Sequence, residues 1–138
     1  MPNTLSLEIV THSGVAYQAQ VDGLVAPGVD GYFGVLPRHA PLVAQLKVGQ
    51  LRLRQGQSWR VYAISGGIFH VRSGQALVLA DALEAAEEID VARAQQALDR
   101  ARRRLREGRR DPQVDADRAR AALMRALNRL RAADLHHH

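Results

Sequence analysis

The arginines of residues 88–105, EIDVARAQQALDRARRRL, are the side chains in this sequence best placed to do chemistry. The segment holds five arginines and no lysine, and Asp90 stands where a helix is expected to begin. Guanidinium groups offer planar pairs of donors that suit carboxylate and phosphate oxygens. Four uses follow from these residue types: a solvated helix face, a nucleic-acid patch, a grip on a phosphate ligand, or a docking surface for an acidic partner.

No enzyme motif accompanies these arginines. The sequence lacks the G-x-x-x-x-G-K-[ST] phosphate loop, the G-x-S-x-G elbow and the H-E-x-x-H zinc helix. It contains no cysteine, and His12, His39 and His70 are scattered without the spacing of metal ligands. We therefore expect neither catalytic residues nor a metal site in this chain.

Charge divides the chain into two unequal parts. Residues 1–88 hold 6 basic and 7 acidic side chains, whereas residues 89–138 hold 13 basic and 7 acidic ones. Such an asymmetry suggests a binding role for the basic part. No apolar run approaches the ~18 residues of a membrane span, and the N-terminus does not resemble a signal peptide. We expect a cytoplasmic protein.

Residues 1–84 have the pattern of an antiparallel β-sandwich or barrel. Apolar and polar side chains alternate with a period of two, as in residues 4–11, and glycine-containing turn signals recur at short intervals. A hairpin is predicted around residues 55–58. Residues 75–80 predict a closing strand.

The predicted hairpin has its own alternation. Leu51 and Leu53 point inward, and after the turn the pattern continues through Trp59, Val61 and Ala63. Paired strands of this kind expose one face and bury the other.

Residues 85–135 predict an antiparallel hairpin of two helices. Asp90 and Asp115 suit the N-cap positions, and Gly108 and Pro112 separate the helices. Apolar residues recur at helical spacing and form one stripe on each helix: Ile89, Ala94, Ala97, Leu98, Ala101 and Leu105 on the first, and Ala119, Leu123, Ala126, Leu127 and Leu130 on the second.

These stripes consist mostly of alanine, which lets helices approach closely but buries little apolar surface. At ~25 cal/mol per Å2 of buried apolar area, such a hairpin gains little from packing against itself. We therefore expect it to be marginal alone and able to move. Residues 136–138, three histidines, are interpreted as the remnant of a purification tag and excluded from the fold.

Three segments together resemble the epsilon subunit of bacterial F-type ATP synthases. GYFGVLPRHAPLVAQLKVG (residues 31–49) matches the family's glycine and proline signature, and YAISGGIFHV (residues 62–71) matches its Ser-Gly-Gly strand. VLADALEAAEEIDVARAQQAL (residues 78–98) matches its junction from sandwich to helix. With the second helix, the resemblance covers residues 4–135 and implies an α+β protein, an N-terminal β-sandwich followed by a C-terminal helical hairpin.

The resemblance implies a non-catalytic function in the central stalk, the rotor of the enzyme. The family couples proton translocation to ATP synthesis, through contacts with the gamma subunit and the membrane-embedded c-ring. Its hairpin can leave the sandwich, extend along gamma and inhibit ATP hydrolysis, and a marginal hairpin suits such a switch. A peripheral protein at the cytoplasmic face of the bacterial cell membrane is implied, with the membrane met only through the c-ring.

Some family members bind ATP on the folded hairpin. The matching residues in this sequence are Glu84, Ile89, Asp90, Arg93, Ala94, Arg100, Arg125 and Arg129. Helical spacing places Arg93 with Arg100, and Arg125 with Arg129, on one helix face each, so four guanidinium groups would hold the triphosphate. Without a phosphate loop or metal carboxylates, the resemblance implies ATP as a regulatory ligand that is not hydrolysed, and no motif requires Mg²⁺.

The resemblance implies that the loop lies near gamma and the c-ring, with an interface at Tyr32, Arg38, His39 and Pro41. Tyr32 stands where the family usually has an acidic residue, and Arg38 stands where it usually has glycine. Acidic segments of the catalytic alpha and beta subunits are the partners implied for the remaining arginines.

Two other functions stay open on the sequence. A free-standing ATP-sensing module would bind ATP without a stable complex with gamma. A nucleic-acid-binding hairpin would bind DNA with a strong salt dependence, although acidic residues interleave with the basic ones. Independently of function, pairs such as Asp99 with Arg103 would stabilise a solvated helix face.

Overall fold

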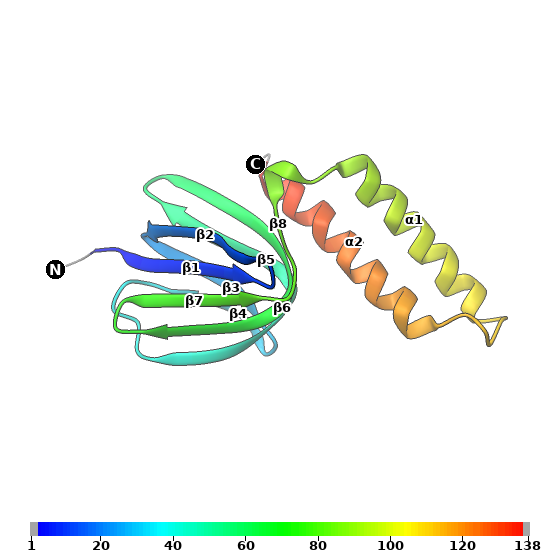
Figure 1. The fold of residues 1–138 in the computed structure, drawn as a ribbon. Helices are drawn as coiled ribbons and strands as arrows, with labels where there is room; N and C mark the ends of the chain where they lie inside the picture. Colours follow the sequence, from blue (N-terminus) through cyan, green and yellow to red (C-terminus); the bar gives the residue numbers. More distant parts are fainter. Residues whose placement is uncertain (1–2, 137–138) are drawn as a thin grey trace.

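The structure, a computed structural model, describes residues 3–136 as a β-sandwich with a helical hairpin extending from one end (Figure 1). The strands are β1 (Leu5–Thr11), β2 (Gly14–Val21), β3 (Gly23–Gly28), β4 (Gly31–Val35), β5 (Leu42–Gln55), β6 (Ser58–Arg72), β7 (Gln75–Ala80) and β8 (Leu83–Ala85). The 3-10 turn η1 (Ala86–Glu88) leads to helices α1 (Val91–Gly108) and α2 (Ala116–His136). The predicted α+β fold, a sandwich followed by a two-helix hairpin, is confirmed.

The strands pair in the order β2-β1-β7-β6-β5-β3-β4, and β8 pairs with β6. The hairpin predicted around residues 55–58 is the turn between β5 and β6, and the predicted closing strand is β7. One pair differs from the antiparallel expectation, because β1 and β7 run parallel. Alternation reveals a buried face but not strand direction, and β1 meets β7 through closure of the sandwich rather than through a turn.

Strands β5 and β6 are long enough, at 14 and 15 residues, to contribute to both layers of the sandwich. They curve together from one layer into the other (Figure 1). Gly66 and Gly67, with φ of 99° and 144°, lie within β6 in a conformation that favours glycine. A Cβ on Gly67 would lie 2.1 Å from the Leu79 carbonyl oxygen, so the approach of β7 requires glycine there.

The sandwich core follows the predicted period of two. Leu5, Leu7 and Ile9 alternate along β1, and all three are fully buried. Phe69 lies at the centre, with its ring 5.4 Å from that of Phe33 in an edge-to-face arrangement. Such aromatic pairs contribute beyond their buried area.

On β6 the two faces are buried by different neighbours. Tyr62 and Ile64 face the sandwich core, whereas Val61 and Ala63 are buried in a second cluster beneath the helices. The alternation through Trp59, Val61 and Ala63 therefore does not continue the inward face of Leu51 and Leu53, and Trp59 is exposed. A strand covered on both faces loses the contrast between apolar and polar positions, which is why the sequence pattern misassigned this face.

Both helices begin where their caps predict. The Asp90 carboxylate accepts a hydrogen bond from the Arg93 backbone N–H at 3.1 Å, and Asp115 accepts one from Arg118 at 3.0 Å. These bonds satisfy N–H groups that have no partner within the first helical turn. Gly108 ends α1, and the helices lie side by side and antiparallel (Figure 1).

The junction between the two parts is continuous. Strand β8 extends to Ala85 and pairs with β6, so the sheet includes the first residue assigned from the sequence to the hairpin. His136 is the last residue of α2, and residues 137–138 of the proposed tag remnant lie outside the described residues.

The hairpin rests on the sandwich mainly through α2, which contacts β5, β6 and η1. The buried residues of this contact form a second cluster: Val61, Ala63, Ala86, Ile89, Ala94, Ala132 and Ala133, with Leu130 packed against it. Small side chains bring the backbones close but remove little apolar surface from water. Among residues 3–136, tyrosines aside, the only buried polar or charged side chain is that of Asn128 on α2.

Candidate functional site

A cavity of about 280 Å3 opens where the two helices meet the edge of the sandwich. Five alanines are among its lining residues, which are Ala63, Ser65, Ala82, Leu83, Glu84, Ala97, Ala122, Arg125, Ala126, Asn128 and Arg129. The small side chains leave the space, and the charged ones come from β8 and α2. Its volume lies near the lower end of the ~300–1,000 Å3 common for small-molecule sites.

The four arginines implied for phosphate binding stand in two positions. Arg125 and Arg129 line the cavity, whereas Arg93 and Arg100 have exposed side chains on α1 and do not line it. Ala97 does line it, and Arg93 and Arg100 flank Ala97 by four and three residues on the same helix face. The structure thus places two guanidinium groups at the cavity wall and two on the helix face beside it.

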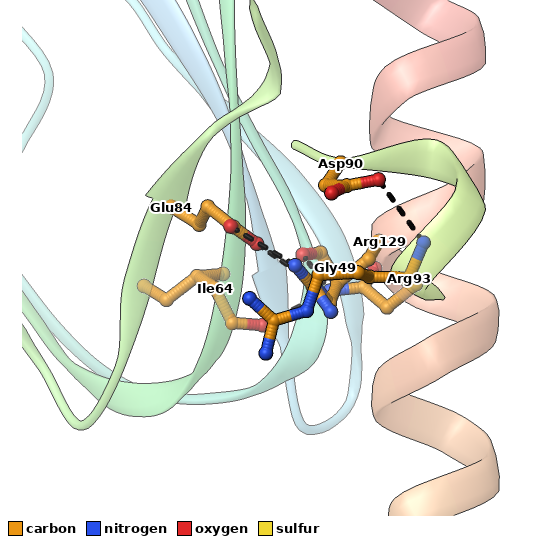
Figure 2. Close-up of polar contacts among 7 residues, drawn as sticks. Gly49, Ile64, Glu84, Asp90, Arg93 and Arg129 are labelled. Carbon is orange, nitrogen blue, oxygen red and sulfur yellow. Dashed lines mark hydrogen bonds and ion pairs between the residues drawn. The ribbon is translucent and has the colours of Figure 1, made fainter. Parts of the chain in front are cut away.

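Arg129 already has an acidic partner. Its Nε lies 2.7 Å from Oε1 of Glu84 and its second nitrogen 3.1 Å from Oε2, a bidentate pair (Figure 2). The hydrogen bond to Glu84 raises the pKa of Arg129, burial opposes the rise, and the charges of Glu84 and Asp90 add to it. Arg129 therefore stays cationic, and any phosphate that reaches it meets a guanidinium shared with a carboxylate.

The remaining residues of the ATP motif have structural functions in this state. Asp90 caps α1 (Figure 2), while Ile89 and Ala94 are buried in the cluster that joins the hairpin to the sandwich. Their side chains hold the start of α1 beside Glu84. Asp90 and Glu84 keep carboxylate oxygens near this junction, where a ribose or base could donate hydrogen bonds.

The other arginines of α1 are exposed. They are Arg102, Arg103, Arg104 and Arg106, followed by Arg109 and Arg110 after the helix. Asp99 accepts a hydrogen bond from Gln95 at 3.2 Å, and the ion pairs of the described residues do not include the expected one between Asp99 and Arg103. These guanidinium groups are thus available to solvent or to an acidic partner.

The loop between β4 and β5 carries three of the four predicted interface residues. Arg38 has φ of 75°, and the His39 ring nitrogen Nδ1 lies 2.7 Å from the Ala40 carbonyl oxygen. A positive φ explains why glycine suits position 38, and arginine there carries backbone strain. Pro41 and Leu36 are exposed in the same loop, at the end of the sandwich opposite the helices (Figure 1).

Tyr32 does not join that loop. It is the second residue of β4, and its hydroxyl lies 3.0 Å from both the backbone nitrogen and Oε1 of Gln50. The structure therefore separates Tyr32 from Arg38, His39 and Pro41.

The sandwich also carries an exposed row of apolar side chains that was not predicted from the sequence. Val15, Val10, Leu79 and Ile68 are direct cross-strand neighbours on β2, β1, β7 and β6. Val15, Leu79 and Ile68 are 60%, 45% and 42% exposed, although exposed apolar side chains usually occur singly. The available signal was in β7, where Leu77 and Leu79 occupy one face and Ala76 and Val78 the other, a pattern typical of strands covered on both faces.

Comparisons with known proteins agree with this architecture. The family described as ATP synthase, Delta/Epsilon chain, beta-sandwich domain matches residues 4–86, and its long alpha-helix domain matches residues 87–134. The ATP synthase epsilon chain of Moorella thermoacetica is 49% identical over 132 residues, which cover 94% of this chain and 96% of that protein. The epsilon chain of Desulforamulus reducens is 49% identical over 105 residues, or 76% of this chain and 80% of that protein.

A solved structure extends the likeness to three dimensions. A chain in the mitochondrial ATP synthase of Euglena gracilis, solved as an OSCP/F1/c-ring assembly, superposes with a TM-score of 0.84 at 27% identity. The match covers 99% of this chain and 84% of that one. The chain described here belongs to the epsilon chain family of the ATP synthases. Neither helix of residues 3–136 is long and apolar enough to span a membrane.

Proposed function

We propose that this chain is the epsilon subunit in the central stalk of a bacterial F-type ATP synthase, where it couples proton translocation to ATP synthesis. The observation that carries the proposal is the presence of both domains of the family in one chain, with 49% identity to a bacterial relative along almost its whole length. The subunit itself has a structural and regulatory function and performs no catalysis. It would be peripheral, at the cytoplasmic face of the cell membrane.

Two surfaces of the sandwich support this assembly. The apolar row formed by Val10, Val15, Ile68 and Leu79 suits a protein partner, and we assign it to gamma. The loop with Arg38, His39 and Pro41 lies at the opposite end of the sandwich from the hairpin, and we assign it to the c-ring. In this arrangement the hairpin is left free to respond to its own ligand.

Co-purification of this chain with gamma and the c-ring tests the assembly. Replacing Leu79 by lysine puts a charge into the apolar row and is expected to abolish retention by gamma, because an unpaired charge in a desolvated interface is costly. Val91→Lys, at an exposed position on α1, is the matched control. Retention of the Leu79→Lys variant at the wild-type level would remove the row from the interface, and failure of the unmodified chain to co-purify would favour a free-standing ATP-sensing module.

We also propose that the docked hairpin binds ATP without hydrolysing it. The support is the cavity lined by Glu84, Arg125 and Arg129, with Arg93 and Arg100 on the helix face beside it and Asp90 at the start of α1. A ligand held by residues of both helices and β8 would favour the docked hairpin by mass action, and thereby oppose inhibition of ATP hydrolysis by the extended form. In the extended form, the exposed arginines near the end of α1 would face acidic segments of the alpha and beta subunits.

Calorimetric titration of the full chain tests the ligand. ATP is expected to bind saturably with excess EDTA present, and Arg93→Ala and Arg125→Ala are each expected to weaken binding by about tenfold or more, since charge-assisted hydrogen bonds are among the stronger ones. Arg104→Ala, which removes an exposed arginine away from the cavity, is the control. Equal losses in all three variants would indicate a general charge effect, and tight salt-dependent DNA binding would favour the nucleic-acid alternative.

A further inference from the structure

Asn128 is an exception in the surface that joins the hairpin to the sandwich. Its neighbours in that surface are mostly alanines, yet this amide side chain is only 5% exposed. Burial of an amide is costly unless hydrogen bonds replace the lost water. Asn128 therefore needs defined partners in the docked state.

Those partners come from both strands of the bend. The Asn128 Nδ2 group donates to the carbonyl oxygens of Gly49 at 2.8 Å and Ile64 at 3.3 Å, which stand opposite each other on β5 and β6. Its Oδ1 accepts a hydrogen bond from the Gln50 side-chain amide. Both polar atoms of Asn128 are thus satisfied by the sandwich.

The hydrogen bonds continue beyond Gln50 to β4. The Tyr32 hydroxyl donates to Oε1 of Gln50 at 3.0 Å and accepts from the Gln50 backbone N–H at 3.0 Å. Gly49 makes room for this arrangement, because a Cβ there would lie 2.7 Å from the Tyr32 hydroxyl and 2.5 Å from Cβ of Pro27. Tyr32, which the resemblance places at an intersubunit interface, thus also supports a contact within the chain.

We propose that Tyr32, Gly49, Gln50 and Asn128 form a polar latch that holds the hairpin on the sandwich in one register. Alanine packing is weak and tolerates sliding, whereas Asn128 meets both carbonyl groups in one position of α2. The latch remains reversible because water can satisfy the same groups after release. An asparagine that specifies register is a known use of a buried polar group.

The same contact makes Asn128 a positioning residue for the proposed nucleotide site, and this part rests on the proposed function. Asn128 lines the cavity next to Arg129 and one turn from Arg125. By fixing α2 against the bend, it places both guanidinium groups opposite Glu84. We expect loss of the latch to lower the docked fraction first and nucleotide affinity as a consequence.

The decisive experiment measures the docked fraction without any nucleotide. Cysteines introduced at the exposed positions Gln57 and Arg104 carry spin labels, and the distance between them reports docking in the full chain, which has no other cysteine. Asn128→Asp removes both donated hydrogen bonds and sets a carboxylate against two carbonyl oxygens. We expect the ratio of docked to released hairpin to fall by roughly tenfold or more, while the sandwich unfolds at an unchanged urea concentration.

Two variants separate the latch from general effects. Met124→Asp adds the same charge one turn away at an exposed position, and is expected to leave docking unchanged. Tyr32→Phe removes one hydroxyl and is expected to weaken docking less than Asn128→Asp, with little added effect in the double variant because the groups act as one network. Should Asn128→Asp fail to fold, Tyr32→Phe carries the test.

The outcomes distinguish the latch from the nucleotide site. An unchanged distance distribution in Asn128→Asp, or in Tyr32→Phe if that variant stands alone, would overturn the latch. A released hairpin with weaker ATP binding supports both the latch and the positioning function. A released hairpin in a chain whose unmodified form binds no ATP supports the latch and rejects the proposed nucleotide site.

Discussion

The two buried regions of this protein are built from different side chains. The sandwich core contains leucine, isoleucine, valine and phenylalanine, many of them with no exposed surface, whereas the hairpin contact consists largely of alanine with one asparagine. Large apolar groups contribute most of the free energy of folding, while small ones permit close contact at little gain. The difference is what we expect of a chain that combines a stable scaffold with a hairpin proposed to leave it.

The largest effect should come from the centre of the sandwich. Replacing Phe69 by alanine removes a fully buried ring that packs edge-to-face on Phe33. We expect a loss of ~3–5 kcal/mol in the free energy of unfolding, measured in urea. Leu79→Ala, at an exposed position of β7, is the control and should change the free energy of unfolding by less than ~0.5 kcal/mol. A small change in the free energy of unfolding for Phe69→Ala would mean that the sandwich core is not the main source of stability.

Gly49 lies where the two regions meet. In Gly49→Val, the added atoms would collide with Pro27 and with the Tyr32 hydroxyl, and we expect a loss of ~1–3 kcal/mol in the sandwich together with release of the hairpin. Urea unfolding and hydrogen exchange of the helices report the two effects separately. For Gly34→Ala the nearest atom is 3.8 Å away, so this control should show neither effect. If Gly49→Val lowers sandwich stability without releasing the hairpin, or releases the hairpin without lowering sandwich stability, then the two effects do not depend on one another.

Leu130 is the largest apolar side chain of α2 that packs against the second cluster. We expect Leu130→Ala to weaken docking by ~1–2 kcal/mol and to leave the urea unfolding of the sandwich unchanged, because the two regions share few side chains. Faster proteolysis within α1 and α2 would report the release. The control variant Met124→Ala, changed at an exposed position, should be cleaved at the rate of the unmodified chain. If Leu130→Ala lowered the stability of the sandwich as much as it weakened docking, the division into two regions would be contradicted.

The smallest effect should come from the ion pair between Glu84 and Arg129. The side chains of Glu84 and Arg129 are 34% and 30% exposed. A double-mutant cycle with Glu84→Gln and Arg129→Gln should therefore give a coupling of ~0.2–1 kcal/mol in the free energy of docking. Because the pKa of Arg129 is raised in the fold, its contribution is complete below the unfolded pKa and is lost only at strongly alkaline pH. Between about pH 6 and 9, Arg129 should therefore add no pH dependence to docking, measured by the distance between the spin labels. The assignment would be contradicted if the unmodified chain lost docking between about pH 6 and 9 and the Arg129→Gln variant did not.

Much of the architecture was determined by the sequence alone. The alternation of Leu5, Leu7 and Ile9 predicted β1, and the caps at Asp90 and Asp115 predicted where both helices begin. These features depend on neighbours a few residues apart, because strand periodicity and capping are local. The residues proposed to bind ATP could likewise be placed near the junction of sandwich and hairpin, because several of them lie between the last predicted strand and the first predicted helix in the sequence.

Tertiary structure alone decided the contacts that join the two parts. Only the folded chain shows that Val61 and Ala63 face the helices, that Arg129 is paired with Glu84, and that Asn128 meets two carbonyl groups far away in the sequence. Such contacts bring together residues from β5, β6, β8 and α2, whose separation along the chain leaves no periodic signal. The sequence by itself determined which elements form, and the curvature of β5 and β6 decided which side chains those elements place against one another.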